Sequence, residues 1–389
     1  CLLLSHNFIA LILMPFYFAF VFFLLWQEEM KKKISLLILT SFSLFLGLTC
    51  YFWLPALWEK KDTLVDTILI RELASYKLHF VYLRQLWNSP WGYGGSIFGL
   101  EDGISFEVGK LHLILSLLAG ILGLSLLIKK EKGGWLISFF FGLFAFSLFM
   151  TSFHSQFIWD FLKPLWYLQF PWRFLIFSVF FASILSGGVI SHLFSQLKKR
   201  VRLKWLMLVG VGILVICLNK AYFLPASYLE VDDHYYTSEE DLKWRVSGFS
   251  FEFVPEGVAT RLSDIGTTQL DISQDEIGKT SFEVLDGDLE VEETINFPHK
   301  KVFVTNGKGK LRVNVYSFPG WKARIDQKEV GIEETGKLKL VTLDVPEGEH
   351  RVEVVFTDTP VRRTANLVSL MSMATLFLAG GLGVKKSFQ

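Results

Sequence analysis

The chain has 389 residues, of which 51% are hydrophobic and 16% aromatic, and its mean hydropathy is +0.39. A soluble protein of this length does not need so much apolar surface, so the composition excludes that class and indicates a polytopic membrane protein. The net charge of only +1 hides a marked unevenness in where the basic residues fall along the chain.

Long apolar runs predict membrane-spanning helices, because a helix of about 20 residues crosses the hydrocarbon core. These runs cover about 7–26, 34–54, 111–128, 134–153, 174–196, 205–223 and 366–384. Basic clusters lie between them, at Lys31–Lys33, at Lys129, Lys130 and Lys132, at Lys198–Arg200 with Arg202 and Lys204, and at Lys385 and Lys386. If every run crosses once, the clusters share one side, which we predict to be cytoplasmic.

The sequence therefore predicts a membrane α-helical bundle with an extracytoplasmic all-β sandwich domain, placed in the cytoplasmic (inner) membrane. Residues 1–223 form the transmembrane domain with outer loops 55–110 and 154–172, residues 224–364 the sandwich, and residues 365–389 a last span and a basic tail. The chain starts at Cys1 inside an apolar run, which we interpret as the C-terminal part of a longer protein. Cys50 and Cys217 also lie in apolar runs, so no disulfide framework is expected.

The first outer loop begins with an expected amphipathic helix over Thr63–Trp87, lying along the membrane surface. Its apolar face would carry Leu69, Leu73, Tyr76, Phe80 and Leu83. The helix leads into Gln85–Lys110, named here the Trp/Gly loop. This loop combines Trp87, Trp91 and Tyr93 with glycines and ends on Glu101 and Asp102. Aromatic rings suit the headgroup level and glycines permit tight turns, so the loop is either a substrate site or a structural cap.

The second outer loop, 154–172, contains Trp159, Asp160, Trp166 and Tyr167 and continues into Arg173. Arg173 would stand at the outer mouth of the next span, because Pro171 suits the first turn of a helix. There it would either extend to lipid phosphates or bind the phosphate of a lipid-linked substrate through two hydrogen bonds.

The segment from Leu224 changes to short alternating strands separated by turns, which is typical of a β-sandwich. The clearest strands are Ser250–Val254, Leu311–Ser317, Lys337–Val345 and His350–Phe356. Trp321 and Trp244 are candidates for stacking on a sugar, although each is equally suited to a hydrophobic core.

Several chemistries lack their sequence signals. The chain has no P-loop and no dinucleotide fingerprint, and its eight histidines are too scattered for a zinc site. The span interiors lack ionisable side chains, which argues against an ion-coupled transporter. The basic clusters are explained by topology, so no nucleic-acid partner is expected.

Three stretches resemble a bacterial family of polytopic membrane proteins: Ser5–Asn7, the Trp/Gly loop, and Leu168–Phe174 (LQFPWRF). The family carries the label "6-pyruvoyl-tetrahydropterin synthase-related", and Phe318–Trp321 and Pro346–Phe356 are similar to its outer β domain and to that of YfhO-like membrane proteins. The pterin activity is rejected, because that enzyme needs clustered zinc-binding histidines and a cysteine nucleophile. The architecture is similar to that of GT-C glycosyltransferases.

This resemblance implies sugar transfer from a polyprenyl-phosphate donor at the outer membrane face, in cell-envelope glycan assembly. The catalytic carboxylate of such enzymes lies in an early outer loop, which we expect upstream of Cys1. Cations or a divalent metal ion would neutralise the departing phosphate. The residues expected to bind substrate are His6, Arg84, Trp91, Tyr93, Glu101, Asp102, Lys110 and Arg173. The competing hypothesis is a non-catalytic scaffold that handles membrane lipid or cell-surface glycan.

Overall fold

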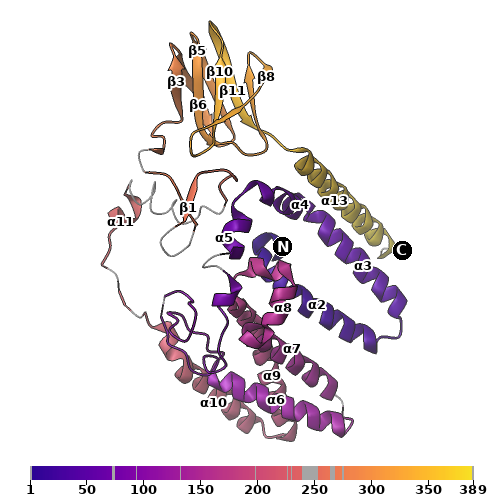
Figure 1. The fold of residues 1–389 in the computed structure, drawn as a ribbon. Coiled ribbons are helices and arrows are strands. Elements are labelled where there is room, and N and C mark those ends of the chain that lie inside the picture. Colours follow the sequence, from indigo (N-terminus) through magenta and orange to yellow (C-terminus); the bar gives the residue numbers. More distant parts are fainter. Residues whose placement is uncertain are drawn as a thin grey trace.

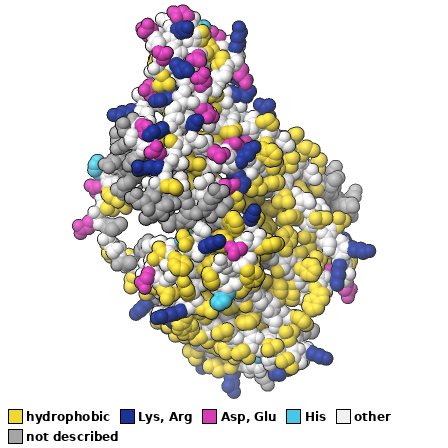
Figure 2. Space-filling model, viewed as in Figure 1, with side chains coloured by type: hydrophobic (Ala, Val, Ile, Leu, Met, Phe, Trp, Pro, Cys, Tyr) yellow, Lys and Arg dark blue, Asp and Glu magenta, His cyan; other side chains and the backbone are white. Residues whose placement is uncertain are grey.

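The computed structural model describes residues 2–71, 75–92, 94–131, 133–197, 199–225, 227–228, 230–238, 253–262, 268–273 and 276–387. It has a helical part and a β domain that projects from one end of it (Figure 1). Hydrophobic side chains cover much of the helical part, whereas charged side chains are concentrated on the β domain and at the helix ends (Figure 2). This division is the one expected if lipid surrounds the helices and water surrounds the β domain.

Five helices are long and apolar enough to cross a membrane. They are α2 (Asn7–Gln27), α6 (Lys110–Ile128), α7 (Gly134–Thr151), α9 (Leu175–Gln196) and α10 (Val201–Asn219). A sixth candidate is the pair α3 (Lys31–Leu48) and α4 (Cys50–Glu59), whose two halves are bent by 65°. The seventh predicted span, 366–384, falls in α13 (Pro360–Ser387). Among the described residues, α13 is not one of the helices found to be long and apolar enough to cross a membrane.

Shorter helices lie between these long ones. The α-helical segments are α1 (Leu2–Ser5), α5 (Val65–Arg71), α8 (Gln156–Phe161) and α11 (Asp233–Thr237). The 3-10 turns are η1 (Lys60–Asp62), η2 (Tyr76–Leu78), η3 (Phe153–Ser155), η4 (Lys163–Leu168), η5 (Pro171–Phe174) and η6 (Lys220–Phe223).

The core of the helical part is formed by α2, α6, α7 and α9. Phe16 of α2 stacks on Phe177 of α9 with the ring centroids 4.7 Å apart. Helices α7 and α9 approach closely because small polar residues face each other: the hydroxyls of Ser147 and Ser178 lie 2.9 Å apart, and Ser147 donates to a carbonyl of its own helix. Helix α10, whose residues are all described, buries none of its side chains, as expected for a helix facing lipid.

The bend between α3 and α4 has an identifiable cause in α13. Ser369 of α13 inserts at the break, where its hydroxyl donates to the Gly47 carbonyl (2.9 Å) and accepts from the Tyr51 amide (2.9 Å). An inserted side chain that replaces a backbone bond of the helix is one of the few causes of a sharp kink. The predicted span over 34–54 corresponds to this bent pair, and the sequence prediction does not include the bend, because its cause lies in the distant helix α13.

One end of the bundle collects the loops predicted to lie outside. The Val81 amide donates to the Thr151 carbonyl at the end of α7, and the Val108 amide donates to the Leu86 carbonyl just before α6. The short connections 28–30, 129–133 and 197–200, which carry basic residues at or beside them, join antiparallel helices at the opposite end. Lys132 and Lys198 of those clusters lie outside the described residues.

The long amphipathic helix expected over Thr63–Trp87 is wrong. Among the described residues of this stretch, which leave out 72–74 and with them Leu73, only α5 and η2 are helical, and residues 83–87 form turns. Tertiary contacts override the helical periodicity. Tyr76 is buried and stacks on Trp159 with ring centroids 5.4 Å apart, and Val81 forms a parallel bridge with Ser152.

The β domain contains two antiparallel sheets. One has the order β3 (Phe282–Gly287), β6 (Gly309–Tyr316), β10 (Leu340–Val345) and β9 (Glu333–Thr335). The other has the order β4 (Glu290–Phe297), β5 (Lys300–Asn306), β11 (Glu349–Phe356), β7 (Trp321–Ile325) and β8 (Lys328–Val330). Alternate side chains from both sheets, such as Val313, Val341, Phe303 and Val352, form one buried cluster.

Outside these sheets, β1 (Thr260–Leu262) pairs with β2 (Thr268–Leu270). The strand expected at Ser250–Val254 lies mostly outside the described residues, as does Trp244; Phe253 and Val254 are in a turn and a bend. Trp321 is half-buried against Phe356, with ring centroids 5.3 Å apart.

A buried ion pair joins the β domain and α13 to the end of α4. The Arg362 guanidinium donates from Nε (2.9 Å) and Nη2 (2.7 Å) to Oε2 of Glu59, and the Thr359 hydroxyl donates to Oε1 (2.6 Å). The other side of Arg362 lies on the Phe356 ring, 4.6 Å from its centroid. Glu59 and Arg362 expose only 10% and 15% of their side chains, so each depends on the other for its polar contacts.

Glu59→Ala should destabilise the protein strongly, because it leaves the buried Arg362 guanidinium without its partner. Removing one member of a buried pair typically costs about 3–5 kcal/mol. The matched control is Glu329→Ala, which breaks the exposed pair with Lys322 and should cost less than about 1 kcal/mol. Thermal unfolding of the purified variants in detergent measures both. Equal melting temperatures for the two variants would show that the buried pair does not hold the joint.

Candidate functional site

The Trp/Gly loop is a packed cap whose buried carboxylate is used internally. Asp102 is 5% exposed and accepts hydrogen bonds from Gln85 Nε2 (2.6 Å) and the Ile97 amide (2.9 Å). Glu107 similarly accepts from the Ser89 amide at 3.0 Å. These bonds fold the loop back on itself. Asp102 is therefore placed as a turn-stabilising residue, which is the structural alternative that the sequence left open.

Two glycines of this loop are required by close backbone approach. The Gly94 amide donates to the Gly103 carbonyl (2.9 Å), and the Gly103 amide donates to the Gly95 carbonyl (3.0 Å). A β-carbon at Gly103 would lie 2.5 Å from the Gly94 Cα, a distance that no side chain tolerates. Gly95 has open space at the same position. The close approach of these two backbone segments thus explains why glycine occupies positions 94 and 103, but it does not explain Gly95.

The other predicted residues of the first outer loop are spread over the cap. Trp91 lies edge-on to Tyr222 at 5.0 Å, and its Nε1 donates to the Leu224 carbonyl at 3.4 Å, so it fastens the loop to the end of α10. Arg84 and Glu101 are exposed, and Lys110 is the first residue of α6. Tyr93 lies outside the described residues.

Two predicted residues from distant parts of the chain, His6 and Arg173, share one hollow at the end of the helical part that carries the Trp/Gly loop. The hollow has a volume of about 330 Å³ and lies between the start of α2, α4 and η5. Its lining residues are Leu4, Ser5, His6, Asn7, Phe8, Phe52 and Arg173. We name it the Arg173 pocket.

Arg173 is held by aromatic rings and not by acids. Its guanidinium carbon lies 4.7 Å from the centroid of Phe8 and 5.0 Å from that of Phe170. Its Nη1 is buried without a hydrogen-bond partner, and within the described part of the chain the side chain makes no ion pair. A guanidinium stacked in this way keeps donors available for an anion.

His6 adds a second donor to this pocket. It is the N-cap of α2, and its Nδ1 accepts from the Ile9 amide at 3.4 Å. A neutral imidazole that accepts at Nδ1 carries its proton on Nε2, so the tautomer assigned from this bond makes Nε2 a donor. The amide end of α2 also favours negative charge. None of the described residues that line the pocket is acidic, so the pocket suits an anion.

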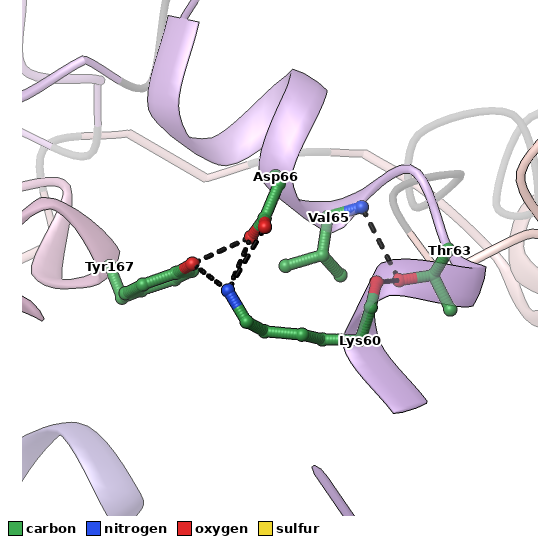
Figure 3. A network of polar contacts seen from close by, with 5 residues as sticks. All are labelled: Lys60, Thr63, Val65, Asp66 and Tyr167. Atoms are coloured by element: carbon green, nitrogen blue, oxygen red, sulfur yellow. Dashed lines mark hydrogen bonds and ion pairs between the residues drawn. The ribbon is translucent and has the colours of Figure 1, made fainter. Parts of the chain in front are cut away.

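A polar network fixes the segment that leads to Arg173. Tyr167 donates to Asp66 Oδ1 at 2.6 Å, Lys60 contacts the same phenol, and Lys60 Nζ lies 2.9 Å from Asp66 Oδ2 (Figure 3). Burial and then the hydrogen bond to the Asp66 carboxylate raise the pKa of the Tyr167 phenol. Leu168, the next residue, is fully buried, and Gln169 adopts a φ of +60°. The backbone between Tyr167 and Arg173 is thus held at both ends.

Sequence reasoning missed this network and the contribution of Phe52. Lys60 and Asp66 are too far apart for a helical pair, and Tyr167 follows 101 residues after Asp66. A second missed contact is the hydrogen bond from Tyr76 to Asp160, which together with burial raises the pKa of Tyr76. No local pattern predicts either contact.

The described residues hold no group of three or more histidines, cysteines or acids that could bind a metal ion. No protein-family model matches the chain, and neither a curated protein nor a solved structure matches it significantly. Functional interpretation therefore depends on the Arg173 pocket itself.

Gly103→Ala should disrupt the Trp/Gly loop, because the added methyl group collides with the Gly94 backbone. Gly95→Ala is the matched control and should leave the loop intact, since nothing lies within 4 Å of its β-carbon position. Limited proteolysis of the two purified variants compares them. We expect faster cleavage within 85–110 for the first variant only, and equal rates would contradict the close approach.

Proposed function

We propose that the chain is a multi-pass inner-membrane protein, similar to GT-C glycosyltransferases, whose Arg173 pocket binds the phosphate of a polyprenyl-phosphate-linked sugar. The observation that carries the proposal is a hollow lined by Arg173 and His6 and by no acid among its described residues, together with a buried Arg173 Nη1 that has no hydrogen-bond partner. Guanidinium groups suit phosphate because their planar donors match its oxygens.

The position of the pocket supports a lipid-borne ligand. It opens where α2, α4 and η5 begin or end, and Phe8 and Phe52 line it beside the polar residues. A phosphate at this level would leave its lipid chain among apolar side chains and its sugar toward the outer loops. Transfer would then require a carboxylate base for the acceptor hydroxyl. The described lining residues offer none, so we assign to this chain the binding of the donor phosphate.

Binding without catalysis is the alternative, and the same observation favours it. A pocket with donors and no acid is sufficient for a scaffold or lipid-handling protein that retains an anionic lipid. The two functions separate in one assay: a transferase consumes the lipid-linked sugar, whereas a scaffold binds the lipid and leaves the glycosidic linkage intact.

In the proposed orientation, the β domain is an extracytoplasmic β-sandwich and the basic connections face the cytoplasm. Two facing antiparallel sheets with a shared core support the sandwich assignment. The positive-inside preference supports the sidedness, because the described basic residues at Lys31–Lys33, Lys129, Lys130 and Arg200 lie at the end opposite the Trp/Gly loop.

Arg173→Met should weaken binding of a lipid phosphate such as farnesyl phosphate by roughly 10- to 100-fold, since a hydrogen bond to a charged group contributes about 1.5–3 kcal/mol. The matched control is Arg84→Met, which removes the same charge from an exposed turn outside the pocket. Titration of the purified variants measures the affinities.

The stability of the same variant provides a second readout. Among the described residues Arg173 has no acidic partner that its removal would leave unpaired, and Met can still pack on the rings of Phe8 and Phe170, so Arg173→Met should unfold at the same temperature as the parent protein, or above it. Unchanged binding, or a binding loss matched by Arg84→Met, would remove Arg173 from the site.

The sidedness is tested separately with intact spheroplasts. A protease added from outside should cut within 224–364 and leave the connection at 198–204 uncut, because only the former faces the medium. Antibodies to each region would identify the fragments. Cleavage at 198–204 alone would reverse the proposed orientation.

A further inference from the structure

Three phenylalanines at the outer end of α7 form an exposed stripe that the proposed function does not use. Phe153, Phe157 and Phe161 follow one another at intervals of four residues across η3 and α8. Their exposed fractions are 59%, 67% and 83%. Residues four apart share a helix face, so the three rings form one continuous apolar strip. The opposite face holds the fully buried Trp159.

The stripe continues the surface of a membrane-length helix. The ring of Phe157 lies 6.3 Å from that of Phe149 in α7, and Phe153 lies 5.8 Å from Phe80 in the preceding loop. Phe98 of the Trp/Gly loop, itself 68% exposed, lines a shallow hollow together with Phe153 and Phe80. The exposed rings are therefore contiguous with the apolar side of the bundle.

The length of α7 places these rings at membrane depth. Its 18 residues rise about 27 Å, which is shorter than the hydrocarbon core of about 30 Å. Residues immediately after Thr151 then still lie in the outer part of the bilayer. Lys163 and Lys77, both exposed near the stripe, have the length to reach lipid phosphates from there.

The buried polar groups of this segment have partners inside the protein, whereas His154 and Asp160 are exposed. The Ser155 hydroxyl donates to the Ser152 carbonyl (2.8 Å), Trp159 Nε1 donates to the Met150 carbonyl (3.2 Å), and Trp166 Nε1 donates to the Trp159 carbonyl (2.7 Å). Internal partners for the buried donors are what a lipid environment requires, because no water is available there.

We infer that residues 153–161 lie in the outer leaflet of the membrane, with the stripe of Phe153, Phe157 and Phe161 in contact with lipid acyl chains near the headgroups. The outer cap is thus partly immersed, whereas the sequence places 154–172 simply outside the membrane. The inference is independent of the ligand of the Arg173 pocket.

Single cysteines carrying an environment-sensitive NBD label test this inference in the full chain, after its three cysteines have been replaced by serine. Phe157→Cys and Phe161→Cys report on the stripe. Ile213→Cys, 57% exposed in the middle of α10, is the lipid control, and Asp288→Cys, exposed in the β3–β4 turn, is the water control. All four side chains are exposed, so none of the substitutions removes a core contact.

The proteins are reconstituted into phosphatidylethanolamine and phosphatidylglycerol vesicles that contain doxyl-labelled lipids. We expect blue-shifted emission at 157 and 161, quenched more by a doxyl group near the headgroup than by one deep in the chain, with the reverse order at 213. Water-like emission that matches position 288 would overturn the inference. Blue-shifted emission without lipid quenching would also overturn it, because the stripe would then be covered by protein, such as a second copy.

Discussion

Polar groups at membrane depth have no water to bind, so the protein must supply their partners, and this constraint shapes the helical part. Ser147 and Ser178 satisfy each other between α7 and α9, and Ser369 satisfies the two backbone groups that the bend between α3 and α4 leaves open. The Glu59–Arg362 pair applies the same solution to full charges. In each case the contact that gives a buried polar group its hydrogen-bond partner also fixes the distance between two helices.

Among the described residues of the helical part, three buried side-chain atoms depart from this constraint: Ser116 Oγ, Trp172 Nε1 and Arg173 Nη1. Trp172 Nε1 and Arg173 Nη1 are both buried without partners, next to each other in the chain. Two unmet donors are costly in a region where nearly every other donor is paired. An unsatisfied buried donor needs a physical explanation, and a ligand that supplies the missing acceptor is one that the pocket beside Arg173 offers. Arg362 has the same side chain, but its Nε and Nη2 both donate to the Glu59 carboxylate. This contrast is the reason for proposing Arg173, and not Arg362, as a ligand-binding residue.

Much of the helical part could be predicted because an apolar run of membrane length permits few other structures. The predicted runs coincide with α2, α6, α7, α9 and α10 within a few residues. The bend after Leu48 could not be predicted, because its cause, Ser369, lies 318 residues from Tyr51. The amphipathic pattern over 63–87 misled for a related reason: Tyr76 and Val81 pack on the second outer loop, and helical periodicity does not encode that contact.

The sequence predicts both proposed ligand-binding residues of the Arg173 pocket, but it could not predict that these two residues lie together. The sequence predicts His6 from a resemblance and Arg173 also from its position just before an apolar span, together with residues that the structure distributes over the cap. His6 and Arg173 line one pocket because α2 and η5 begin at the same end of the helical part, and this alignment results from the packing of the helices. The Lys60–Asp66–Tyr167 network was not predictable, since its members are unremarkable singly and meet only after the loops fold.

The Ser369 insertion and the Glu59–Arg362 pair also set an order of events during synthesis. Helices α3 and α4 leave the ribosome long before α13, with the whole β domain between them. Until α13 arrives, Gly47 and Tyr51 lack their partner and Glu59 lacks its cation. Helices α3 and α4 therefore stay without these contacts until α13 has been synthesised, which happens only after the whole β domain has been made, so their final packing is a late step in folding.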